Sequence, residues 1–390
     1  MKRANDIFSS LGTTVFTVMS QLAVEHKAIN LGQGFPDSNG PNDVRAKAAI
    51  FLDDQPNQYP AMMGVPELRD AVAAHAKRFY GLDVDWRTEV MVTSGATEAL
   101  TASLIGLINP GDEVVLMEPL FDSYLPIVRL AGGIPKLVRL TPPAWELPRA
   151  ELAAAFSAKT KAIVINSPMN PNGKVFSADE LAFIADLVKR HDAYAICDEV
   201  YEHLIFDGGK HIPLMCLPDM RDRCLRIGSA GKTFSLTGWK VGYVTAAPAL
   251  LQPVAKAHQF LTFTTPPNLQ RAVAYGLGKD DAYFRTLADE LEHKRDLLTA
   301  GLRKLGFGVA TSQGTYFVSA DFSKLGFSGD DMDFCRAITV EAGVAAIPIS
   351  AFFEGDGPST FVRFAFCKQD SVLTEALDRL ARFIAKFQIR

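Results

Sequence analysis

The sequence predicts an α/β fold, in which a large domain with a mostly parallel sheet flanked by helices is joined to a smaller α+β domain. From about residue 89, short apolar runs rich in Val and Ile alternate with helical patterns. Such alternation is typical of parallel sheets covered on both faces. After about residue 281, a long amphipathic helical pattern is followed by short strands. We therefore expect a large domain over residues 46–280 and a small domain formed by residues 1–45 and 281–390.

The expected elements follow in order along the chain. Each predicted strand of the large domain is a short apolar run: residues 89–94, 112–119, 160–168, 193–200, 224–229 and 241–248. Helical patterns cover residues 96–108 and 177–191, and the second begins with a capping box of Ser177 and Glu180. The small domain is expected to hold a helix over residues 282–306, strands over 315–322 and 361–367, and a closing helix from Ser371.

Composition limits the class of function. The residues are 48% hydrophobic and 22% charged, as in an ordinary soluble protein, and the net charge of -4 includes no block of like charges. We therefore expect small-molecule substrates, with no nucleic acid and no membrane as partner. No signal peptide or long apolar run is visible, and five scattered cysteines fit a reducing compartment, so a cytoplasmic protein is expected. The seven histidines lack metal-ligand spacing, and no metal site is predicted.

The segment 229–243, SAGKTFSLTGWKVGY, contains two lysines whose purpose has to be explained. Its Gly-Lys-Thr looks like the end of a phosphate-binding P-loop, but that loop needs a glycine five positions before the glycine of Gly-Lys. Arg226 occupies that position. Because the spacing does not fit, a P-loop is excluded and Lys232 must serve another purpose.

Polar residues follow several predicted strands, at the edge where an open parallel sheet binds its ligands. Gly95, Ala96 and Thr97 open a predicted helix, whose unpaired amides and dipole favour an anion such as phosphate. Simple turn geometry would also explain a glycine there. The turn at residues 166–176 is dense in asparagine and proline, and its simpler explanation is ordinary turn chemistry.

An aspartate, a tyrosine and a lysine are expected at the same edge. Asp198 ends one predicted strand, Tyr201 follows it, and Lys232 comes after the next strand. Asp198 alone could merely cap the following element, but the combination indicates a specific chemistry. A lysine amine condenses with an aldehyde, and a pyridine ring kept protonated by an aspartate accepts electrons from a carbanion. Pyridoxal phosphate uses both properties and is the predicted cofactor.

From INLGQGFPD at residue 29 to FVRFAFCK at residue 361, the sequence resembles the fold-type I pyridoxal-phosphate aminotransferases of class I and II. Within residues 229–243, the resemblance makes Lys232 the Schiff-base lysine and makes Ser229 and Lys240 ligands of the phosphate. Many relatives carry arginine where Lys240 stands. The lysine ammonium would bind the phosphate as a compact charge, whereas an arginine guanidinium binds it with two parallel hydrogen bonds.

The resemblance implies further cofactor ligands. Asp198 would pair with the pyridine nitrogen, and Tyr201 would donate to the phenolic oxygen of the cofactor. Asn170 would bind the same oxygen and reach the substrate carboxylate. Phe121 would stack on the ring. The implied phosphate ligands also include the helix-opening residues Gly95, Ala96 and Thr97.

The resemblance also implies a substrate site and a homodimer. Arg363 would clamp the α-carboxylate, and the backbone of Gly34 would approach it closely. Tyr59 would reach the phosphate of the neighbouring subunit, so the active sites would be shared. Aromatic residues would surround the substrate side chain: Phe16, Phe35, Tyr59, Phe121 and Tyr124. Ordinary core packing stays an alternative for Phe121 and Tyr124, as does a solvated strand arginine for Arg363.

The predicted activity moves the amino group of a medium or large neutral or aromatic L-amino acid, of the methionine, glutamine, phenylalanine or kynurenine type, to a 2-oxo acid. No second arginine for a distal carboxylate can be assigned. Segments GTTVF, NQYP and GTYF also resemble bacterial N-succinyl-L,L-diaminopimelate aminotransferases of lysine synthesis, which are one alternative. A cysteine-conjugate β-lyase is another, because it would use the same residues. A regulatory ligand sensor is disfavoured by the intact Lys232.

Overall fold

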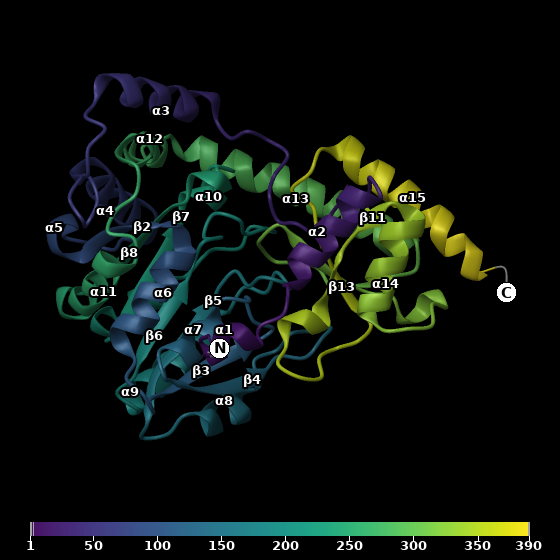
Figure 1. The fold of residues 1–390 in the computed structure, drawn as a ribbon, viewed down its shortest axis with the longest axis horizontal. Helices are drawn as coiled ribbons and strands as arrows, with labels where there is room; N and C mark the ends of the chain where they lie inside the picture. Colours follow the sequence, from purple (N-terminus) through teal and green to yellow (C-terminus); the bar gives the residue numbers. More distant parts are fainter. Residues whose placement is uncertain (1, 3, 389–390) are drawn as a thin grey trace.

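The computed structural model describes residue 2 and residues 4–388, and its centre is a seven-stranded sheet (Figure 1). The strand order is β2-β8-β7-β6-β5-β3-β4. The strands are β2 (Val90–Ser94), β3 (Glu113–Glu118), β4 (Ile134–Arg139), β5 (Thr160–Asn166), β6 (Tyr194–Asp198), β7 (Cys224–Ser229) and β8 (Val241–Ala246). The predicted mostly parallel sheet is confirmed.

Within this described sheet, β8 is the strand that runs antiparallel to its neighbours β2 and β7. Residues 230–240 connect β7 to β8. Parallel neighbours need a crossover of about a dozen or more residues. This connection is shorter than that. β8 accordingly pairs with β7 in the antiparallel direction, which a short connection allows.

Helices bury both faces of the sheet. On β3, Val114 and Leu116 join one apolar core, whereas Val115 and Met117 join another. The first core includes residues of α6 (Gly95–Leu107), α7 (Tyr124–Leu130) and α11 (Pro248–Leu261). The second includes residues of α8 (Arg149–Ala155) and α9 (Ala178–Arg190). Burial on both faces explains why the strands are continuous apolar runs in the sequence.

The predicted capping box at the start of α9 is confirmed. Ser177 Oγ accepts a hydrogen bond from the Glu180 amide at 3.2 Å, and Glu180 Oε2 accepts one from the Ser177 amide at 2.8 Å. These two bonds satisfy amides that the first helical turn leaves unpaired.

A third core closes the β2 end of the sheet. It joins residues of β2 and β8 to α3 (Asn42–Asp54), α4 (Pro66–Tyr80) and α12 (Pro267–Leu277). The short helices α5 (Trp86–Glu89) and α10 (Ala230–Thr233) lie directly before β2 and after β7.

The carboxyl-terminal part of the chain forms a second, antiparallel sheet beside the first (Figure 1). Its order is β12-β13-β10-β9. The strands are β9 (Gly308–Val309), β10 (Phe317–Asp321), β12 (Ile347–Pro348) and β13 (Phe361–Ala365). The helices of this part are α13 (Asp281–Lys304), α14 (Asp331–Ala337) and α15 (Asp370–Gln388).

Most of the amino-terminal segment packs against this second part, whereas its first helix contacts α7 beside the large sheet. It contains α1 (Asp6–Ser10), α2 (Val15–Glu25) and β1 (Ile29–Asn30), and β1 pairs in parallel with β11 (Val344–Ala345). The helix α3, which crosses the predicted boundary at residue 45, packs on α12 instead. The domain boundaries themselves stay predictions. Among the helices of the described residues, none has the length and hydropathy needed to cross a membrane.

A buried cluster of charges lies behind the ends of β6 and β7. Arg226 on β7 is 1% exposed and donates from Nε to Glu199 Oε2 at 2.6 Å. Its Nη2 pairs with Glu202, which also accepts a 2.5 Å hydrogen bond from the Tyr80 hydroxyl. Burial opposes ionisation of Glu202, but Arg226 holds the pKa of this carboxyl well below its usual range. The cluster therefore keeps its charges by mutual pairing.

Two histidines extend this cluster. The Nε2 atoms of His75 and His203 are 2.7 Å apart, and one ligand atom from each of His75, His203 and Glu202 lies within 4.8 Å of the others. Burial lowers the pKa of His75 to about 3 and that of His203 to about 4, so both rings are neutral at neutral pH. Glu202 is already bound by Arg226 and Tyr80. We therefore interpret the three residues as part of the hydrogen-bonded core.

We predict that Arg226→Met lowers the free energy of unfolding by about 3–5 kcal/mol, because it leaves two buried carboxylates without their cation. Urea unfolding followed by circular dichroism measures the change. The matched control is Arg223→Met, which breaks an exposed pair with Asp192 and should cost less than about 1 kcal/mol. Equal losses in the two variants would contradict the prediction.

Candidate active site

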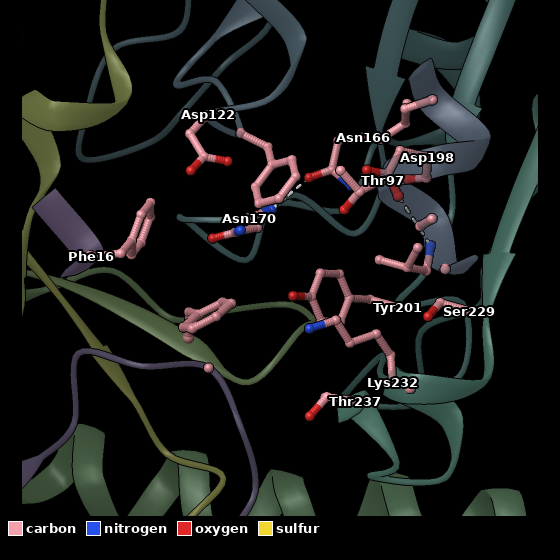
Figure 2. Close-up of a pocket in the computed structure, with 18 of the residues that line it drawn as sticks. Phe16, Thr97, Asp122, Asn166, Asn170, Asp198, Tyr201, Ser229, Lys232 and Thr237 are labelled. Carbon is pink, nitrogen blue, oxygen red and sulfur yellow. Dashed lines mark hydrogen bonds between the residues drawn. The ribbon is translucent and has the colours of Figure 1, made fainter. Parts of the chain in front are cut away.

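The carboxyl ends of the parallel strands open on one cavity of about 360 Å³ (Figure 2). Asn166 ends β5, Asp198 ends β6 and Ser229 ends β7, and all three line it. The second sheet closes the cavity with Phe317 of β10 and Arg363 of β13. The site therefore lies where the two sheets meet, at the strand ends where the sequence predicted it.

Most of the predicted site residues line this one cavity: Phe16, Gly34, Gly95, Ala96, Thr97, Phe121, Asn170, Asp198, Tyr201, Ser229, Lys232, Lys240 and Arg363. Tyr59 does not, and its side chain is 85% exposed with the ring packed edge-on against Phe263. Phe35 is half-exposed and also lies outside the lining. Tyr124 is buried next to the cavity, where its hydroxyl has a polar partner described below.

The amino end of α6 forms a cradle for an anion. Gly95 has φ +72°, and a Cβ there would lie 3.2 Å from the ammonium of Lys240. A Cβ on Gly242 would lie 2.6 Å from the carbonyl carbon of Gly95 and 2.8 Å from the amide nitrogen of Ala96. Both glycines thus allow the helix start to approach a lysine and the strand β8. Amides, a lysine and nearby hydroxyls are the donors that bind a phosphate.

Lys232 projects into the cavity from α10, beside Tyr201 (Figure 2). Its Nζ donates a 2.7 Å hydrogen bond to the hydroxyl of Tyr316, which in turn donates to the Gly34 carbonyl at 2.5 Å. Burial lowers the pKa of Lys232 to about 8. A fraction of the amine is therefore uncharged near neutral pH, as a nucleophile or a proton acceptor requires.

Asp198 is a buried carboxylate at the end of β6. Its Oδ2 accepts a 2.6 Å hydrogen bond from the Tyr124 hydroxyl. Burial raises the pKa of Asp198 to about 6. Asn166 donates to the Asp198 carbonyl at 2.9 Å and accepts from the Asn170 amide at 2.8 Å, so it ties the two strand-end turns together. A carboxylate in this position is suited to hold a cationic ring nitrogen.

Arg363 is 2% exposed and reaches the cavity from β13. Its guanidinium donates to Asn170 Oδ1 at 2.8 Å and to the Gly32 carbonyl at 2.6 Å, and it lies 3.9 Å from the centre of the Phe317 ring. Burial lowers the pKa of Arg363 to about 10, so it is cationic at neutral pH. Among the described residues its Nε has no hydrogen-bond partner, which leaves a buried donor for an anionic ligand.

Several residues that line the cavity, or contact a side chain in it, were missed by the sequence analysis. Asn166 could have been found, because it is the polar residue that follows the apolar part of a predicted strand at the binding edge. Tyr316 bonds to Lys232 across 84 residues of sequence and comes from the other part of the fold, so no local pattern indicates it. Asp122 and Gln33 also line the cavity. Each is adjacent to a residue with a predicted role, Phe121 and Gly34 respectively.

The chain is similar to known aminotransferases over almost its full length. The family described as "Aminotransferase class I and II" matches residues 26–380. The probable N-succinyldiaminopimelate aminotransferase DapC of Mycobacterium tuberculosis is 44% identical, covering 95% of this chain and 96% of that protein. Methionine aminotransferase of Escherichia coli is 40% identical, again covering 95% of this chain and 96% of that protein. The kynurenine–oxoglutarate transaminase of Dictyostelium discoideum is 39% identical, covering 96% and 95%.

Solved structures agree with this similarity. The structure of N-succinyldiaminopimelate aminotransferase from Mycobacterium tuberculosis superposes with a TM-score of 0.95 at 44% identity, covering 97% of this chain and 100% of that one. The arrangement of both sheets is therefore the one that these enzymes share.

The raised pKa of Asp198 predicts a pH-dependent stability of the ligand-free protein. A folded pKa of about 6, above the ordinary 3.8, gives stability that is full below pH 3.8 and is lost as the pH rises through 6, by about 3 kcal/mol in total. Asp198→Asn avoids this cost, so its stability relative to the parent should grow from pH 5 to pH 8 in urea unfolding. The control is the exposed Asp378→Asn, whose difference from the parent should stay constant. A constant difference for Asp198→Asn would contradict the assignment.

Proposed function

The chain belongs to the class I and II aminotransferases, and from that premise we propose the roles of its cavity residues and the class of its substrates. The enzyme is an aminotransferase that uses pyridoxal phosphate, as its family does. When bound, this cofactor supplies an aldehyde that takes up the amino group and a protonated pyridine ring that delocalises the charge left when the α-proton is removed. The observation that carries the proposal is the convergence of Lys232, Asp198 and Arg363 on one cavity.

The cradle at the start of α6 would hold the phosphate. The backbone of Gly95, Ala96 and Thr97 would donate to it, with Ser229 and Lys240 as further ligands. The close approach allowed by the two glycines supports this assignment, since a Cβ on Gly95 would crowd the Lys240 ammonium. A lysine neutralises a phosphate as a point charge and imposes less orientation than the fork of an arginine.

The pyridine ring would lie between the strand ends. Asp198 would hold the ring nitrogen protonated, which fits a buried carboxylate whose pKa is raised by desolvation, because a cationic ligand relieves that cost. Tyr201 and Asn170, which line the same cavity, would donate to the phenolic oxygen. Phe121 would stack against the ring.

Lys232 would hold the aldehyde carbon and, once displaced by the substrate amine, move the α-proton. A pKa of about 8 suits this task, because an effective general base has a pKa near the working pH. The hydrogen bond to Tyr316 fixes Nζ in the cavity. Tyr316 would therefore limit the positions from which the amine takes and returns the proton.

Arg363 would bind the α-carboxylate, which is common to all amino-acid substrates. Its unpaired Nε is available for this bond, and Asn170 already orients the guanidinium from the turn that follows β5. Gly34 keeps the approach open, because a Cβ there would lie 2.3 Å from the Phe317 ring. Phe16, whose ring lies 5.3 Å from the guanidinium, would border the substrate.

The cavity favours neutral or aromatic side chains. Three cations line it, Lys232, Lys240 and Arg363, and the assignments above use all three. We therefore propose a medium or large neutral or aromatic amino acid as donor, of the methionine, glutamine, phenylalanine or kynurenine type. The 44% identity to a probable N-succinyldiaminopimelate aminotransferase supports a second candidate, N-succinyl-L,L-diaminopimelate.

We further propose a homodimer, working in the cytoplasm, in which Tyr59 reaches the phosphate of the partner subunit. Exposed aromatic residues occur in this part of the chain: Phe263 packs on Tyr59, and Phe260, three residues before Phe263, is 84% exposed. Exposed apolar side chains of this kind are typical of surfaces that pack against a second chain.

We predict that Lys232→Ala abolishes covalent attachment of the cofactor and lowers the rate of transamination of methionine by about 10³-fold or more. Borohydride reduction followed by mass spectrometry of peptides measures the attachment. The exposed Lys256→Ala is the control and should behave as the parent. A reducible lysine adduct that persists in Lys232→Ala would overturn the assignment.

Subunit mixing tests the cross-subunit role of Tyr59. Tyr59→Phe should weaken cofactor binding by about 0.5–3 kcal/mol, because one hydrogen bond to a charged group is lost. A heterodimer of the Lys232→Ala and Tyr59→Phe chains holds one site with Lys232 and a native partner Tyr59, and one site with both defects. Normal cofactor affinity should therefore return in half of the sites, as measured by cofactor titration. No recovery after demonstrated subunit exchange would rule out the shared site.

A further inference from the structure

One charged side chain of the cavity has no part in the mechanism above. The acidic residues that line the cavity are Asp122 and Asp198, and the proposed function uses Asp198 for the cofactor. Asp122 follows β3 and lies in the turn that leads into α7. Its carboxylate faces the space between Phe16 and Asn170 (Figure 2), on the side of the cavity where the substrate side chain would lie.

The Asp122 carboxylate is free to receive a ligand. It accepts a long hydrogen bond of 3.4 Å from the Ser123 hydroxyl, and none of the ion pairs among the described residues includes it. The residue is more than a third exposed, yet the surrounding protein desolvates the carboxyl enough to raise its pKa above the ordinary value. Arg363 contributes an opposite charge from the same cavity, but its hydrogen bonds go to Asn170 and Gly32 and not to Asp122.

We propose that Asp122 determines substrate specificity, by accepting a hydrogen bond from an N–H group at the end of the substrate side chain and by repelling a terminal carboxylate. The proposal rests on the function proposed above, in which Arg363 binds the α-carboxylate. The favoured substrates are then amino acids whose side chains end in an amide or another N–H donor. Side chains that end in a carboxylate, including a succinyl group, are disfavoured.

Charge explains both halves of this selectivity. A hydrogen bond to an ionised carboxylate is stronger than one between neutral groups. A second carboxylate in the same partly desolvated cavity is repelled, because the two charges are screened less there than in bulk water. Since the amino acid and the oxo acid use the same site in turn, the same restriction applies to the amino acceptor. An oxo acid with a neutral side chain should therefore be a better acceptor than 2-oxoglutarate.

Glutamine and glutamate test the inference, because they have the same shape and differ in the terminal group. At pH 8, the parent enzyme should favour glutamine over glutamate in kcat/KM by about 10- to 100-fold. Asp122→Asn should reduce that ratio by about 10-fold or more, mainly through KM. The matched control is the exposed Asp378→Asn, which removes the same charge from α15 and should leave the ratio as in the parent.

A binding measurement separates recognition from a merely structural effect. Glutaramate and glutarate are unreactive analogues that carry the amide or the second carboxylate, and their inhibition constants should differ in the parent and converge in Asp122→Asn. An active Asp122→Asn enzyme that keeps the parent's glutamine preference, or that loses affinity for both analogues equally, would overturn the inference. Failure of the proposed function has a different signature, since the parent itself would then transaminate none of methionine, glutamine and glutamate.

Discussion

The buried pairing of Arg226 with Glu199 and Glu202 is the constraint on which the site depends. Along the turn that follows β6, residues that face the cavity alternate with residues that face this cluster: Asp198 and Tyr201 line the cavity, whereas Glu199 and Glu202 bind Arg226. The ion pairs fix the turn from behind, and the hydrogen bond from Tyr124 fixes the Asp198 carboxylate from the side. The cavity-facing groups are therefore held in place before a ligand binds.

Burial shifts the ionisation equilibria of the cavity groups toward their uncharged forms. It raises the pKa of Asp198 to about 6 and lowers that of Lys232 to about 8 and that of Arg363 to about 10. Keeping each of these groups charged costs desolvation free energy, and a bound ligand of opposite charge offsets part of that cost. A site with separate acidic and basic groups is in this way suited to a ligand that carries a phosphate, a ring cation and a carboxylate.

Sequence patterns predicted those parts of the fold and site that depend on local chemistry. The strands of the large sheet and the capping box of Ser177 were found because periodicity and capping are local properties, and Lys232 because it follows a strand end. The reversed direction of β8 was not predicted, since it depends on the length of one connection. Tyr316 was missed for a related reason, because its contact with Lys232 joins two parts of the fold that no short pattern connects.

The hydrogen bond between Arg363 and Gly32 joins an early and a late part of the chain to be synthesised. Arg363 donates to the carbonyl of Gly32, which lies 331 residues earlier, and at about 5–20 residues per second a ribosome needs roughly 15–65 s to make that interval. During this time the strand β1 lacks its partner β11, and the aromatic ring of Phe16 has no cavity to border. The large sheet between them can form first, so the pairing of β1 with β11 and the bond of Gly32 to Arg363 can form only near the end of translation.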